Sequence, residues 1–211
     1  MQKRTDVTIK MANASRQSAE EVSSQLTAIW NNFADGSKSL EYYADVLTKL
    51  GATTASSSSE ISEGLQKFAS IGETVGLSYE YAASALATIT ATSRESADTV
   101  GNALKTLFAR IQSLKLGDTL EDGVDLNKYA AAIEKVGVHV LDTNGELRDM
   151  DAILDDLMER WDNLDRTAQT ALAQTVAGQR QYAQFMTLMN NSDFFRQNVE
   201  TAKGSEGSLQ E

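Results

Sequence analysis

One amphipathic stretch decides the fold class of this chain: residues 100–114 read VGNALKTLFARIQSL. Its large apolar side chains recur every three or four residues, which places them on one face of an α-helix; they are Val100, Leu104, Leu107, Phe108, Ile111 and Leu114. A half-buried strand would instead alternate with a period of two. The stretch therefore predicts a long helix, running towards Gly117, whose apolar face belongs to the core.

The same helical period recurs on both sides of this stretch, and most of the apolar stripes begin after a capping residue. Two of these starts are capping boxes, in which a serine precedes a glutamate by three residues: Ser18 with Glu21, and Ser57 with Glu60. Single N-caps are expected at Ser78, Asp149 and Asp165. The 211 residues contain no proline, so long helices joined by glycine and serine are favoured.

One segment departs from the helical period. Residues 138–141 read VHVL and alternate, and the sequence Asp142-Thr-Asn-Gly145 that follows is typical of a tight turn. A second short apolar segment around Leu147 completes the pattern. We therefore expect one small β-hairpin near 138–148.

Together these patterns predict an all-α fold, namely a compact domain of about eight or nine helices with that one hairpin. We expect a polar N-terminal segment at 1–17 that could be flexible, a helical core domain at 18–203, and a C-terminal segment at 204–211 that is cut from a longer protein. No run of residues approaches the roughly 20 apolar residues that a membrane-spanning helix needs.

Composition excludes several classes of site. Cysteine is absent and His139 is the only histidine, so neither a zinc site nor a disulfide is expected, and no cofactor is indicated. The net charge of −11 does not favour binding to nucleic acid. The cations Lys105, Arg110 and Lys115 are spread along one helix, where they are expected to form a solvated face.

Two acidic features could suggest chemistry, but simpler readings are preferred. The Asp142–Gly145 loop lacks the ligand pattern of a calcium site, because Val140 and Asp151 would fill its first and last positions. The adjacent acids Asp155-Asp156 and Glu20-Glu21 point about 100° apart on a helix, so neither pair is preset to flank one glycosidic bond. No catalytic residue is expected, His139 included, and the chain is predicted not to be an enzyme.

Five residues are candidates for helix packing or for an interface. Ala177-Gly178 is expected inside a helix, where glycine costs about 1 kcal/mol relative to alanine, so close approach of a neighbouring helix would explain it. Trp161, Phe194 and Phe195 could anchor an interface, although core packing is the favoured alternative.

The order of several motifs resembles the core of phage tail tape measure proteins. The first is Ser93-Arg-Glu-Ser96 leading into Leu104-x-x-Leu-Phe-Ala-Arg-Ile111, and the Asp-x-x-Gly turn follows. The others are Ile153-Leu-Asp-Asp-Leu-x-x-x-Trp161 and Ala177-Gly-Gln-Arg-Gln181, the latter followed by Phe185 and Asn190-Asn191. The resemblance covers roughly residues 19–207.

This resemblance implies a structural protein of the virion, assembled in the bacterial cytoplasm. Such a protein helps to organise the tail tip and tube, determines tail length and supports genome ejection. Its expected partners are other tail proteins and copies of itself. Two alternatives stay open: a helical scaffold or protein-binding module unrelated to phage and, less favoured, a segment associated with a cell-wall hydrolase.

Overall fold

The computed structural model describes residues 2–113 and 126–210, and these residues form eleven α-helices with no sheet. The helices are α1 (Gln2–Ser15), α2 (Ala19–Phe33), α3 (Leu40–Thr53), α4 (Ser58–Thr74), α5 (Tyr79–Ser93), α6 (Ala97–Ser113), α7 (Leu126–Glu134), α8 (Met150–Trp161), α9 (Arg166–Ala177), α10 (Tyr182–Asn190) and α11 (Ser192–Lys203). The all-α prediction is confirmed, whereas the helix count of eight or nine was too low.

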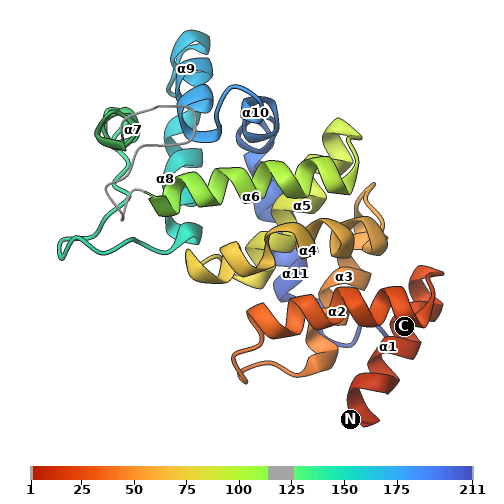
Figure 1. The fold of residues 1–211 in the computed structure, drawn as a ribbon. Helices are drawn as coiled ribbons and strands as arrows, with labels where there is room; N and C mark the ends of the chain where they lie inside the picture. The colour runs from red at the N-terminus through yellow and green to blue at the C-terminus, as the bar shows by residue number, and fades with distance from the viewer. Residues whose placement is uncertain (1, 114–125, 211) are drawn as a thin grey trace.

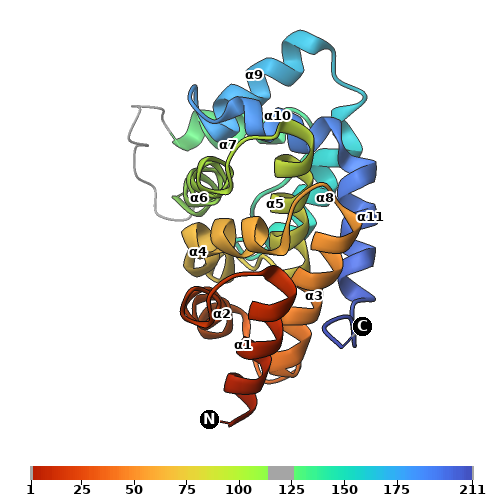
Figure 2. The same ribbon diagram turned by 90° about the vertical axis from the view of Figure 1, so that its right-hand side faces the viewer.

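Helix α5 lies at the centre of the fold and packs against α3, α4, α6, α10 and α11. Ten of its fifteen residues are buried, most of them small, so neighbouring helices can approach it from all sides. Figures 1 and 2 show the helices stacked from α1–α3 at one end, through α4 and α6, to α9 and α10 at the other, with α11 running along one side. Segments from both ends of the chain therefore enclose one core.

The stretch that decided the fold class forms α6, and its predicted apolar face is buried. Phe108 and Ile111 are fully buried, and Leu104 and Leu107 are 2% exposed. The ring of Phe108 lies 5.7 Å from that of Phe68 on α4. Leu114, Lys115 and Gly117, which the sequence assigned to the end of this helix, lie outside the described residues.

Helices α4 and α6 approach each other closely because each has a glycine at the contact. A Cβ atom placed at Gly101 would lie only 2.6 Å from the carbonyl oxygen of Gly64, and one at Gly64 would collide with the Leu86 side chain of α5. The close helix approach expected at Ala177-Gly178 is therefore found here, at a pair of glycines that sequence reasoning did not single out.

Replacing Gly101 with alanine is expected to destabilise the fold, although alanine is the better helix former by about 1 kcal/mol. The added methyl group meets backbone rather than a side chain that could rotate away, so α4 and α6 must separate, at a net cost of about 1–3 kcal/mol. Urea denaturation measures the change. A more stable variant would mean that α4 and α6 can move apart without loss of stability.

The predicted helix starts are largely confirmed. Both capping boxes form, because the Ser18 and Ser57 hydroxyls accept hydrogen bonds from the Glu21 and Glu60 N–H groups and the glutamates bond back. Ser78 and Asp165 also cap their helices. Asp149 occupies the N-cap position of α8, but its side chain makes no capping hydrogen bond.

The predicted β-hairpin was wrong. Residues 138–148 contain one isolated antiparallel bridge, between Leu141 and Leu147, and no strand. The expected alternation does occur, since Val138 and Val140 are buried and His139 is exposed. Because nothing in the described fold offers a neighbouring strand, two or three residues on each side of the turn form one bridge and no ladder.

The two terminal segments pack on the same helix. In the N-terminal segment 1–17, α1 buries Val7 and Met11 and contacts α3. In the segment 204–211, the backbone N–H groups of Gly207 and Leu209 donate to the two carboxylate oxygens of Asp45 on α3, at 2.9 and 2.7 Å. Helix α3 therefore links both segments to the core.

Candidate functional site

A groove of about 760 Å³ opens beside the N-terminus of α5. It lies between the α2–α3 connection, the start of α3, the α4–α5 turn and the first turns of α8. We call it the acidic groove, because its lining includes one lysine, Lys38, and six carboxylates: Asp35, Glu73, Glu80, Asp149, Asp151 and Asp155.

The start of α8 is attached to the α4–α5 turn by hydrogen bonds. The Met150 N–H donates to the Val75 carbonyl at 3.0 Å, and the Ser78 N–H donates to a carboxylate oxygen of Asp151 at 2.9 Å. Gly76 has a positive φ of 68° and lies against Asp149, which leaves no room for a side chain. Two segments more than 70 residues apart in the sequence are thereby joined along one wall of the groove.

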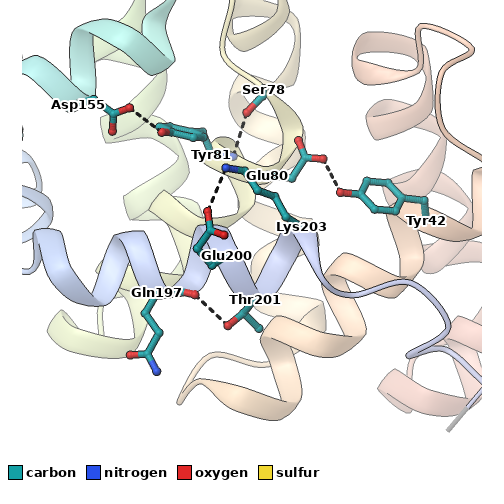
Figure 3. Close-up of polar contacts among 9 residues, drawn as sticks. All are labelled: Tyr42, Ser78, Glu80, Tyr81, Asp155, Gln197, Glu200, Thr201 and Lys203. Carbon is teal, nitrogen blue, oxygen red and sulfur yellow. Dashed lines mark hydrogen bonds and ion pairs between the residues drawn. The ribbon is translucent and has the colours of Figure 1, made fainter.

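Two tyrosines bind carboxylates at this junction, as Figure 3 shows. The Tyr42 hydroxyl of α3 donates to Glu80, and the Tyr81 hydroxyl donates to Asp155 of α8 at 2.8 Å. Burial, and then the bound carboxylate, raises the pKa of both tyrosines. Both phenols therefore stay protonated and donate at physiological pH, so these two carboxylates are engaged within the fold.

Among the carboxyl groups that line the groove, Asp151 has the most strongly raised pKa. Burial raises the pKa of its carboxyl to about 6, the nearby Asp155 and Glu80 add to the increase, and the hydrogen bonds from Ser78 oppose it. The folded state therefore holds a proton on Asp151 at pH values where the unfolded chain has already lost it, and binding of this proton stabilises the folded state. The stabilisation is fully present below the unfolded pKa, near 4, and is lost as the pH rises through about 6.

Replacing Asp151 with asparagine is expected to raise the free energy of unfolding at pH 7 by about 2 kcal/mol, with no gain near pH 4. Asparagine keeps an oxygen that can accept from the Ser78 N–H but carries no charge to desolvate. Melting curves over this pH range measure the difference. Glu20→Gln on the exposed surface of α2 is the control, because it removes a carboxylate that does not line the groove.

Most of the residues predicted for packing or for an interface lie in the core. Trp161 is 1% exposed, its ring packs edge-on against Phe185, and its indole N–H donates to Asn190 at 2.7 Å. Phe195 is fully buried against Tyr81. Phe194 is half-buried. The structure therefore places Trp161 and Phe195 where an outside partner cannot reach them, and it does not bring the five candidates together in one surface.

The placement of Ala177-Gly178 inside a helix was wrong. Ala177 is the last residue of α9, and Gly178 caps this helix with a positive φ of 82°, a conformation that favours glycine. Two helices, α9 and α10, therefore lie on either side of the position that was expected inside one helix. The glycine is needed for the change of chain direction rather than for close helix packing.

Arg110 was also misassigned, because it does not belong to a solvated face. It is 8% exposed, and its guanidinium donates to the carbonyl oxygens of Val176, at 3.2 Å, and Thr175, at 3.0 Å. These carbonyls belong to the last turn of α9, where a positive charge also interacts favourably with the helix dipole. The burial of Arg110 could have been suspected from the sequence, because this basic residue lies among the apolar residues of the α6 stripe.

Three other acidic residues considered in the sequence form contacts within the fold. Asp155 accepts from Tyr81, whereas its neighbour Asp156 forms an ion pair with Arg148 at 2.8 Å. The Asp142 carboxylate accepts the N–H groups of Asn144 and Glu146, as in a turn. Over residues 2–113 and 126–210, no three histidine, aspartate or glutamate side chains form a group that could hold a metal ion.

None of the described helices combines the length and apolarity that crossing a membrane would require. Sequence reasoning also missed the acidic groove, because its carboxylates come from four separate elements. The dense run of acids after Asp149 was the only local hint, and it did not reveal that Tyr42 and Glu80 would lie beside it.

The comparison with known proteins identifies the family. No solved structure matches the chain. The model of the phage-related minor tail protein family matches residues 1–178, which is most of the length of this chain. This range includes the central helix α5, the stretch that forms α6 and the junction of α8 with the α4–α5 turn. The chain therefore belongs to the family of phage-related minor tail proteins.

Proposed function

We propose that this chain is part of a tail tape measure protein, which helps to organise the tail tip and tube, to determine tail length and to support genome ejection. Membership of a phage minor tail family supports a role in the virion tail. The order of motifs from Ser93 to Asn191 adds the resemblance to tape measure proteins in particular. Other tail proteins, and copies of this chain, are the proposed partners.

Within that role we assign this segment to anchoring or nucleation rather than to measuring. The observation that carries the assignment is its compactness: the longest described helices, α4 and α6, have 17 residues and span about 25 Å each. All the described helices pack around one core. A continuous helix of 211 residues would instead span about 315 Å.

The proposed role is structural and not catalytic. Three of the six carboxylates that face the acidic groove support this proposal, because Glu80, Asp151 and Asp155 each accept a hydrogen bond from another part of the fold. A hydrolase would need a pair of carboxylates free to act on a substrate. The purified chain is therefore expected to leave peptidoglycan intact in a zymogram, and lysis that is lost on mutation of one acid would reverse this assignment.

In-frame deletion of residues 18–203 from the phage gene tests the proposal. If the segment nucleates or anchors assembly, electron microscopy of lysates will show missing tails or tails with malformed tips. Normal tails after this deletion would contradict the anchoring role.

A further inference from the structure

The turn between α7 and α8 carries a feature that the tail function does not use. Asn144 and Gly145 lie at its tip, and every residue from Leu141 to Glu146 is exposed. In Figure 1 this blue-green segment projects from the helical body. The described contacts that close it are the bridge between Leu141 and Leu147 and the hydrogen bonds around Asp142.

We propose that Asn144 is a site of spontaneous deamidation, with Gly145 as its reaction partner. The backbone nitrogen of Gly145 loses its proton and attacks the side-chain carbonyl carbon of Asn144. A carbon–nitrogen bond forms, and the side-chain nitrogen leaves as ammonia. Water then opens the resulting succinimide at either carbonyl, so the product is aspartate or isoaspartate.

Access to the reacting atoms favours this position. Gly145 has no side chain to obstruct the attack, and a Cβ atom built there would meet nothing within 4 Å. Its N–H is held by the Asp142 carbonyl at 3.1 Å, so the turn must open briefly before the ring can close. An exposed turn that is held by one bridge and the hydrogen bonds around Asp142 opens at low cost compared with the core.

Three other described asparagines are less favourable. Asn102, Asn163 and Asn191 are each followed by a residue with a side chain, and their side-chain amides donate to Asp98, Glu159 and Thr187. Asn102 also lies within α6, where the amide nitrogens of the main chain are held in helical hydrogen bonds. All asparagines share the same thermolabile side chain. The local geometry therefore decides which asparagine reacts first.

Reaction at Asn144 would change the turn in two ways. It adds a negative charge between Asp142 and Glu146, and the isoaspartate product lengthens the main chain by one carbon atom. The hydrogen bonds from Asn144 and Gly145 to Asp142 depend on the present spacing, so the Leu141–Leu147 bridge is expected to be lost.

Peptide mapping by mass spectrometry tests the proposal on the full, folded chain, incubated in mildly alkaline buffer at body temperature. Asn144 is expected to deamidate faster than Asn102 and Asn163 by an order of magnitude or more, with isoaspartate as the main product. The Asn144→Gln variant should lose this early isoaspartate signal while its circular dichroism spectrum stays unchanged. Equal rates at Asn144 and Asn102, or earlier reaction at Asn191, would overturn the proposal.

Discussion

Replacing Phe108 with aspartate is expected to unfold the domain. Phe108 is fully buried in α6 against Phe68 of α4. Loss of the ring costs about 3–5 kcal/mol, and burying an unpaired carboxylate adds several more. Because the total stability of a domain is about 5–15 kcal/mol, the sum removes most or all of it. Circular dichroism should show little helix and no cooperative melting.

Lys105→Asp is the matched control for this prediction. It introduces the same side chain into the same helix, but Lys105 is exposed. Its effect should stay close to 0.5 kcal/mol. If the Phe108→Asp variant melted like the unchanged protein, the α6 face could not be packed in the core.

Replacing Arg110 with alanine is expected to destabilise the fold by about 3 kcal/mol. The change removes the donors that satisfy the Val176 and Thr175 carbonyls and also removes the positive charge at the C-terminus of α9. A Cβ at Gly178 would lie 3.4 Å from the Arg110 guanidinium, so the turn between α9 and α10 should loosen as well. Thermal melting gives the loss of stability, and hydrogen exchange localises the loosening.

Lys105→Ala is the control in this case, since it removes a cation from the exposed face of the same helix. Little change in stability is expected for this variant. If Arg110→Ala and Lys105→Ala had equal effects, the contacts of Arg110 with α9 would contribute nothing measurable.

The helices and their starts could be predicted because the responsible interactions are local. Ser18 needs only Glu21, three residues away, to form its capping box. The stripe from Val100 to Ile111 follows from the 3.6-residue period, and its burial was predicted correctly for the same reason.

Predictions failed where a distant partner decides the outcome. The hydrophobic pattern around Val138 was read correctly, but a ladder needs a neighbouring strand, and the described fold has none. Arg110 is buried because the carbonyls of α9, some 65 residues further along the chain, need donors. Gly178 ends a helix whose apolar pattern continues beyond it, so periodicity alone joined α9 to α10.

The candidate site was predicted less well than the fold. Trp161 and Phe195 pack inside, which is the alternative that the sequence favoured over an interface for these large aromatic residues. The acidic groove depends on bringing Tyr42, Glu80, Asp151 and Asp155 together from three helices. No spacing in the sequence predicts that these residues lie close together.

Tail length in phage that carry deletions within this segment tests the central claim, that it is a compact anchor, most directly. A compact anchor predicts that deleting helices from residues 18–203 leaves no tails or tails with defective tips, with no graded change in length. Electron microscopy of many tails would measure this. Well-formed tails shortened by about 1.5 Å for every residue removed would mean that the segment is extended along the tube, and would contradict the account.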